Sequence, residues 1–195
     1  RGVAASWALG ELDPGCGSGQ AAGPRGSMAG AAVGQRAPVQ WLGALPASID
    51  GALVMNEVLD AIPPRLVVRR GGDWYERGVE VQPALKWAER PLLDPALIAL
   101  AAGRFPPGID YASEINPAAE ALVGELGRRM QGGAMLIVDY GYPQREYYLP
   151  DRDGGTLLMH YRHRATADPF VWPGLADITA HVDFTAIAVA GVEAG

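Results

Sequence analysis

The segment that most constrains the fold is a short apolar run that stops at polar residues and then meets two prolines. Residues 52–55 (Ala-Leu-Val-Met) have the length of one buried strand, and the prolines stand at 63–64. Because proline has no backbone N–H and cannot continue a strand or helix, Asn56, Glu57 and Asp60 are predicted to lie at the strand's carboxyl end. Open α/β sheets bind ligands at that edge, although an ordinary strand end with solvated carboxylates fits the position equally well.

A second apolar run, residues 134–138, predicts a buried strand that ends at Asp139. Its continuous apolar character is typical of a central parallel strand covered on both faces. Asn116 is placed to cap a helix over residues 118–130, which the glycines 132–133 are expected to end. Strand, helix and strand in this order favour the α/β class.

Two further elements are indicated by local turn and cap signals. Residues 66–70 and 74–81 flank Gly71-Gly72-Asp73, a glycine-containing connection suited to a β-hairpin, which we expect at the periphery of the sheet. A short helix is predicted to begin after Asp94 as N-cap and to end before Gly103.

Residues 142–184 are rich in aromatic and turn residues and predict a long irregular insertion. Compact domains rarely keep such a segment without a function. We interpret it as a lid on the substrate side of the site. The alternative is a packed loop whose aromatic side chains only enlarge the core.

Composition limits the possible partners and compartments. The 195 residues, 49% of them hydrophobic, are enough for one domain over 1–195 with a sizeable core. A net charge of -6 argues against a broad phosphate-binding surface, so no nucleic acid is expected. No apolar run approaches the roughly 20 residues that span a bilayer, no cleavable leader is visible, and the single Cys16 cannot form an internal disulfide. These features predict a protein of a reducing, cytoplasmic compartment.

Four ordered blocks of sequence are similar to the MidA family of S-adenosylmethionine-dependent methyltransferases, relatives of a mitochondrial complex I assembly factor. The blocks are Asn56-Glu-Val-Leu-Asp-Ala-Ile-Pro63, Asp139-Tyr-Gly-Tyr142, Gly155-Thr-Leu157 through His163, and Pro173-Gly174 through Phe184. The resemblance implies a class I, Rossmann-like fold: a twisted, mostly parallel sheet with flanking helices, here with the hairpin and the aromatic insertion. It also implies arginine N-methylation of a protein substrate, with symmetric dimethylation of a respiratory complex I subunit as precedent. Its eukaryotic relatives would be mitochondrial and a bacterial member cytoplasmic.

The resemblance assigns the cofactor site to the first part of the chain. The residues expected there are Glu11, Gly15, Gly17, Gly19 and, from the later strand end, Asn56. Glycines at such a turn let backbone approach a ligand closely. The pattern departs from the family at Asp13, where a glycine is expected, and a flexible loop is an equal alternative.

Residues 1–38 therefore look like a degenerate or incomplete cofactor-binding part. No acidic residue stands between Gln20 and Val39 to hold the cofactor's ribose. Family members also have a long segment before the first motif and continue past the position of Gly195. The chain is either a shortened member or part of a longer protein.

Asn56, Glu57 and Asp60 are the predicted catalytic residues. An arginine guanidinium is protonated in water and pairs bidentately with carboxylates. A carboxylate beside the methyl donor can orient the guanidinium and accept the proton lost on transfer, with Glu57 the first choice and Asp60 the second. In the structural alternative Asp60 caps a turn and Asn56 ties down backbone.

Substrate-binding residues are assigned by the resemblance to the later blocks. They are Tyr140, Tyr161, His163, Asp177, Thr179, His181 and Asp183. Tyr140 or Tyr142 has a ring suited to packing on the sulfonium or on the acceptor guanidinium. A position in the core is an equal alternative for Tyr140.

Two other functions compete with methyl transfer. The stronger is a scaffold or assembly factor that has lost cofactor binding, favoured by Asp13 and the missing ribose acid. The other is a metal hydrolase that uses His160, His163 and His181. We expect no metal, because residues three apart on an extended segment point to opposite faces.

Overall fold

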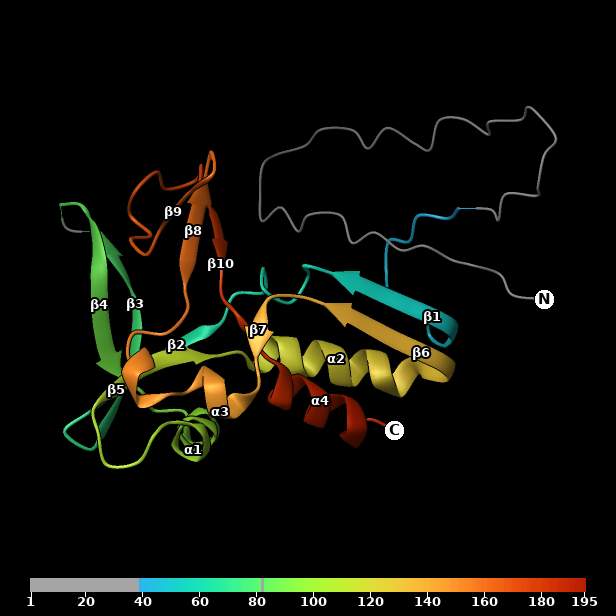
Figure 1. Cartoon of the computed structure of the whole chain (residues 1–195), viewed down its shortest axis with the longest axis horizontal. Helices are drawn as coiled ribbons and strands as arrows, with labels where there is room; N and C mark the ends of the chain where they lie inside the picture. Colours follow the sequence, from blue (N-terminus) through green and yellow to red (C-terminus); the bar gives the residue numbers. More distant parts are fainter. Residues whose placement is uncertain (1–38, 82) are drawn as a thin grey trace.

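The computed structural model describes residues 39–81 and 83–195. These residues form an α/β structure (Figure 1). The longer strands are β1 (Ile49–Asn56), β2 (Arg65–Arg70), β3 (Asp73–Val81), β4 (Leu85–Pro91), β5 (Tyr111–Ile115) and β6 (Met130–Val138). The short ones are β7 (Gly141–Tyr142), β8 (Leu158–Tyr161), β9 (Arg164–Thr166), β10 (Asp177–Thr179) and β11 (Val182–Asp183). The helices are α1 (Pro95–Arg104), α2 (Pro117–Arg129), α3 (Gln144–Tyr147), the 3-10 turn η1 (Pro150–Arg152) and α4 (Phe184–Glu193).

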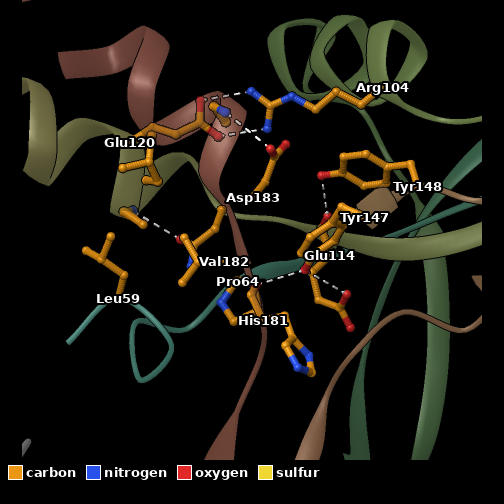
Figure 2. Close-up of a pocket in the computed structure, with 14 residues that line it drawn as sticks. Leu59, Pro64, Arg104, Glu114, Glu120, Tyr147, Tyr148, His181, Val182 and Asp183 are labelled. Atoms are coloured by element: carbon orange, nitrogen blue, oxygen red, sulfur yellow. Dashed lines mark hydrogen bonds and ion pairs between the residues drawn. The ribbon is translucent and has the colours of Figure 1, made fainter. Parts of the chain in front are cut away.

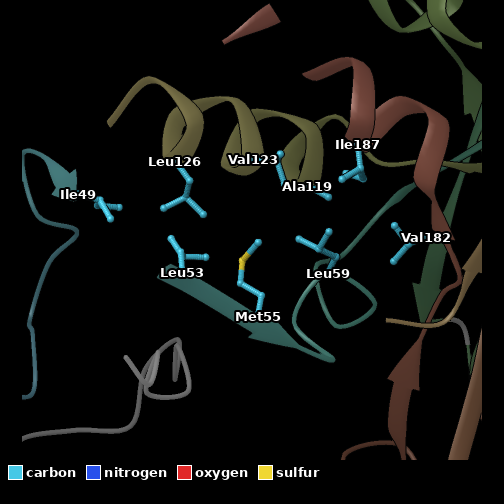
Figure 3. Packing of buried hydrophobic residues seen from close by; sticks show 9 residues of the cluster. All are labelled: Ile49, Leu53, Met55, Leu59, Ala119, Val123, Leu126, Val182 and Ile187. Carbon is cyan, nitrogen blue, oxygen red and sulfur yellow. The ribbon is translucent and has the colours of Figure 1, made fainter. Parts of the chain in front are cut away.

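Strands β1 and β6 form a parallel pair, and both were predicted as strands. One face of the pair packs on α2 and α4, with Leu53 and Met55 of β1 facing Val123 and Leu126 of α2 (Figure 3). Alternate residues on the other face, including Val54 and Leu136, are more than half exposed in the described structure. The prediction that the strand over residues 134–138 is covered on both faces is therefore not confirmed by the described residues.

Helix α2 begins where predicted but ends earlier. The Asn116 side chain accepts the Ala119 N–H at 3.1 Å and donates to the Ile62 carbonyl at 2.9 Å. The helix stops at Arg129, so the prediction that the glycines at 132 and 133 end it was wrong. Both lie inside β6, where a Cβ at Gly133 would collide with the Gly51 backbone of the paired strand. Gly133 therefore allows the backbones of the two paired strands to approach each other closely.

The predicted hairpin is confirmed as β2 and β3. Gly71 and Gly72 have φ of 59° and 91°, and Arg70 pairs with Asp73 across them. This hairpin belongs to a separate antiparallel sheet of order β4-β3-β2-β5. Among the described strands only β1–β6 and β11–β7 pair in parallel, so a mostly parallel sheet is not confirmed by them.

A second core lies beneath the four-stranded sheet. Helix α1 is capped by Asp94 as predicted, but it continues through Gly103 to Arg104. Phe105 and Tyr111 pack edge to face with ring centroids 4.9 Å apart, and Leu97 and Tyr148 belong to the same cluster.

The prediction of an irregular segment over residues 142–184 was wrong. The segment contains α3, η1 and a three-stranded antiparallel sheet of order β10-β8-β9. Its strands of two to four residues are too short to show a periodicity in sequence. Tyr147 and Tyr148 are buried, so for these two the alternative of core-filling aromatics is correct.

No helix in the described part of the chain is both long and apolar enough to cross a membrane.

Candidate active site

The polar turn after β1 starts at the last pair of the parallel ladder. Asn56 stands opposite Val138, and the next residue, Glu57, donates its N–H to the Val138 carbonyl at 2.8 Å. Glu57 has φ of 49°, a left-handed conformation that non-glycine residues rarely adopt and that is concentrated at functional sites. Strand β1 ends at Asn56, and Glu57 and Asp60 follow it, so the predicted position at the carboxyl end of a strand is confirmed. Asn56 and Glu57 are both exposed.

Asp139, at the end of β6, holds this turn in place. Its Oδ2 accepts the N–H groups of Leu59 at 2.9 Å and Asp60 at 3.3 Å, and its Oδ1 accepts the Tyr140 N–H at 2.8 Å. The sequence predicted Asp139 at the end of a second buried strand but did not assign it this role. The usable signal was an acidic residue directly after a second buried strand.

Four carboxylates lie close together at this turn: those of Glu57 and Asp60 belong to it, and those of Asp139 and Asp177 come from other strands. Burial raises the pKa of Asp60, and the charges of Asp139, Glu57 and Asp177 raise it further, against one backbone hydrogen bond that lowers it. Asp177 comes from β10, whose following residue Ala180 donates its N–H to the Asp60 carbonyl at 3.1 Å. The charges of Asp139, Glu57 and Asp177 add to the effect of burial on Asp60, so a cation would be stabilised at this turn.

Tyr140 lies at the same strand end. Its side chain is 63% exposed, and its carbonyl accepts the Val182 N–H at 2.8 Å. The structure thus brings Asn56, Glu57, Asp60, Tyr140 and Asp177 to one region, as the predicted site requires.

Tyr161 and His163 lie farther along the β8–β9 hairpin, which projects from the body of the structure (Figure 1). Tyr161 packs on Trp172 with ring centroids 5.0 Å apart. Arg162 and His163 form the turn of the hairpin with φ of 47° and 62°. Thr179 contacts the Leu158 carbonyl within the sheet at 3.5 Å.

His181 and Asp183 belong to a separate, partly buried polar cluster (Figure 2). Asp183 caps α4 through its Oδ1, which accepts the N–H groups of Thr185 and Ala186 at 3.1 and 3.2 Å. Burial and the Arg152 charge lower the pKa of His181, so its neutral form is favoured.

Two atoms in this cluster are buried without a partner in the described structure: His181 Nδ1 and Asp183 Oδ2. The adjoining cavity of about 20 Å³ has room for one water molecule.

The predicted cofactor residues Glu11, Gly15, Gly17 and Gly19, and with them Asp13, lie outside the described residues. Asn56 is the described member of that set. S-adenosylmethionine contains a sulfonium cation, and the carboxylate-rich turn beside Asn56 fits a positively charged group.

Within residues 39–81 and 83–195, no cluster of three histidine, cysteine or acidic side chains is arranged to hold a metal ion.

This chain is similar to two solved structures of the COG1565 superfamily and to mitochondrial proteins named as arginine methyltransferases. A crystal structure of a COG1565 superfamily member from Burkholderia thailandensis, bound to S-adenosyl-homocysteine, is 48% identical with a TM-score of 0.74; the match covers 80% of this chain and 41% of that one. A second, native structure of a COG1565 protein from the same organism gives a TM-score of 0.76 at 48% identity, over 80% of this chain and 42% of that one.

Curated relatives are more distant. The mouse mitochondrial protein arginine methyltransferase NDUFAF7 is 30% identical over 152 residues, which are 76% of this chain and 33% of that protein. The human protein of the same name is 29% identical over 133 residues, 67% of this chain and 28% of that protein. The chain thus spans about a third of the length of the curated relatives it matches. Residues 20–195 match one protein family throughout, and the chain belongs to that family, the S-adenosyl-L-methionine-dependent methyltransferases.

Proposed function

We propose that this chain is part of a protein arginine N-methyltransferase and that the turn after β1 binds the acceptor guanidinium. The observation that carries the proposal is the position of Asp139, Glu57 and Asp177 close to Asp60, whose pKa is raised first by burial and then by these three charges. A bound cation would relieve the repulsion among these carboxylates. Arginine methyltransferase activity in the name of the mouse relative supports a guanidinium as that cation.

The residues of the turn have distinct roles in this proposal. Exposed Glu57 pairs with the guanidinium fork and directs one nitrogen toward the methyl donor. Asp60, with its raised pKa, accepts the proton that the guanidinium loses on transfer. Asn56 contacts the cofactor. When bound, S-adenosylmethionine supplies an electrophilic methyl group. Alignment of reacting groups can contribute about 7–11 kcal/mol, so the fixed turn is the chain's main contribution.

The substrate side extends from this turn toward β8 and β9. Tyr140 packs on the acceptor cation, and Asp177 adds charge. Tyr161 and His163, on the projecting hairpin, contact the residues of the substrate protein on either side of the acceptor arginine. Thr179, His181 and Asp183 support this surface from within. Residues 142–184 are thus proposed as the substrate-side part of a single domain.

The fold proposed for the whole protein is the class I, Rossmann-like sheet. In it β1 and β6 are neighbouring parallel strands and residues 1–38 contribute to the cofactor side. The substrate we propose is a subunit of respiratory complex I, symmetrically dimethylated on arginine. This rests on the family precedent, and a cytoplasmic location likewise stays a prediction.

The alternative is a methyltransferase-fold scaffold or assembly factor without activity. It is favoured by Asp13 at a position where the family has glycine and by the lack of an acidic residue from 20 to 38 in the sequence.

Two measurements on the protein expressed from its complete coding sequence decide between them. Calorimetry with S-adenosylmethionine and S-adenosylhomocysteine should show binding of both. Mass spectrometry of co-expressed complex I subunits should show dimethylarginine that depends on the protein. Cofactor binding without methylation of any arginine would refute the acceptor assignment, and no binding of either ligand would favour the scaffold.

A further inference from the structure

Glu114 on β5 is one of two buried polar or charged residues among those described, with only 2% of its surface exposed. Its carboxylate is held by N–H and O–H donors. Oε1 accepts the backbone N–H groups of Thr156 and Leu157, both at 3.0 Å. Oε2 lies 3.2 Å from the Tyr147 hydroxyl and 3.3 Å from both the Ser113 and Thr156 hydroxyls.

The chain before β8 is shaped around this carboxylate. Gly155 has φ of +82°, and a Cβ at that position would collide with the Glu114 carboxylate. Glycine is therefore required for the backbone of residues 155–157 to approach the charge closely. The Gly-Thr-Leu block at residues 155–157 is thus explained as the loop that binds the buried Glu114 carboxylate.

Two of the groups bonded to Glu114 also hold the backbone of His181. Thr156 Oγ1 accepts the His181 N–H at 3.0 Å, and the Tyr147 hydroxyl lies 3.0 Å from the His181 carbonyl. The one Tyr147 proton is shared between that carbonyl and Glu114. Figure 2 shows Tyr147 between Glu114 and His181. Both backbone groups of His181 are therefore fixed by side chains that the buried charge orients.

The segment fixed in this way contacts the acceptor turn, by which we mean the polar turn after β1 that contains Glu57 and Asp60. Ala180 precedes His181 and donates its N–H to the Asp60 carbonyl at 3.1 Å. The path from Glu114 through Thr156, His181 and Ala180 to Asp60 consists only of hydrogen bonds and covalent chain.

We propose that Glu114 is a positioning residue: through Thr156 and Tyr147 it sets the place of residues 180–181 and hence of Asp60 in the acceptor site. The part of this inference that concerns methyl transfer rests on the proposed function. A buried charge held by dipoles costs more to keep than an apolar side chain, whereas methyl transfer depends on alignment. A misplacement of about 1 Å can lower a rate about 100-fold.

The test compares three variants of the whole protein. Glu114→Leu removes every hydrogen bond that the Glu114 carboxylate accepts. Glu114→Gln keeps one oxygen for the Thr156 and Leu157 N–H groups, and its amide can donate to hydroxyls that rotate to accept. Glu120→Gln is the matched control: Glu120 is a partly buried carboxylate paired with Arg104 at 2.7 Å, and no step of the path passes through it.

The first readout is hydrogen exchange of the Ala180 amide under native conditions. Glu114→Leu should speed this exchange about tenfold or more beyond any change in Glu120→Gln, and Glu114→Gln should fall between them. Unchanged exchange at Ala180 in Glu114→Leu would overturn the inference. If Glu114→Leu does not fold, Thr156→Val replaces it with the same expectation, because it removes the hydroxyl that links Glu114 and Tyr147 to the His181 N–H while the backbone N–H of residue 156 can still bond Glu114.

The second readout is kinetic. We expect kcat for methyl transfer to fall about 10- to 100-fold in Glu114→Leu, while the Kd for S-adenosylhomocysteine and the kcat of Glu120→Gln stay near wild type. Equal loss of kcat in the two variants would reduce Glu114 to a stability role. If wild type transfers no methyl group to arginine, the proposed function fails, but the exchange measurement still tests the positioning path.

Discussion

Replacing Asp139 should both loosen the acceptor turn and change the ionisation of Asp60. The Asp139 carboxylate accepts three backbone N–H groups, two at 2.8 and 2.9 Å and one at 3.3 Å. A hydrogen bond to a charged group contributes about 1.5–3 kcal/mol, and the long contact contributes less. In a half-buried site water replaces part of this, and removing Asp139 also relieves its repulsion of Asp60. We therefore expect Asp139→Ala to lower the free energy of unfolding by about 2–3 kcal/mol.

Asp139→Asn separates the two effects. It keeps one oxygen, which can serve Leu59 and Asp60 or serve Tyr140 but not both, so its stability loss should be about half that of Asp139→Ala. Loss of the Asp139 charge should lower the pKa of Asp60 in both variants.

The assays are urea unfolding at pH 7 and titration of the Asp60 carboxyl by NMR. The control is Asp110→Ala, which removes a carboxylate that accepts one backbone N–H, from Gly71 at 2.8 Å, at an exposed turn. It should cost less than about 1 kcal/mol. A loss below about 0.5 kcal/mol in Asp139→Ala, or an unchanged pKa of Asp60, would refute the reasoning.

Three further predictions follow from other positions. Because the folded-state pKa of Asp60 is raised, its favourable contribution to stability is present when it is protonated and is lost as pH rises through that pKa. Asp60→Asn should therefore raise the free energy of unfolding at pH 7, and the gain should vanish near pH 3, below the unfolded pKa of about 3.9. Urea unfolding at both pH values measures this difference, and a loss of stability at pH 7 would contradict the prediction. Asn116→Ala should cost about 1–2 kcal/mol in thermal unfolding, because both the cap to Ala119 and the bond to Ile62 are lost, whereas Asn116→Asp should keep the cap; equal stability of the two would contradict this. Asp13→Gly should tighten S-adenosylmethionine binding in calorimetry, and weaker binding would show that Asp13 contacts the cofactor.

Local signals in the sequence predicted local structure well. Asn116 and Asp94 cap helices because side-chain oxygens next to a helix start satisfy its free N–H groups. The glycine pair at 71–72 makes the hairpin because both positions need positive φ. The turn at Asn56 was also predicted from local signals, because an apolar run and two prolines within a few residues define it.

Features that depend on distant contacts were not predictable in this way. Gly133 was taken for a helix end because its reason, the approach of Gly51 on a paired strand, lies about 80 residues away in sequence. Glu114 precedes a helix and gave no sign that residues 155–157 wrap around its carboxylate. Asp139 likewise stood in the right region, but only the structure shows which N–H groups it holds.

Methyl transfer by Glu57→Gln tests the central claim, that a carboxylate at the end of β1 binds the acceptor guanidinium. The change keeps the shape of an exposed side chain and removes its charge. We expect arginine methylation, measured by mass spectrometry on a co-expressed complex I subunit, to fall at least about tenfold, which corresponds to about 1.4 kcal/mol. The affinity for S-adenosylhomocysteine should be unchanged, and Glu80→Gln, which removes a surface carboxylate paired with Lys86, should methylate as wild type does. Undiminished methylation in Glu57→Gln, or methylation of lysine in place of arginine in the wild type, would contradict the account.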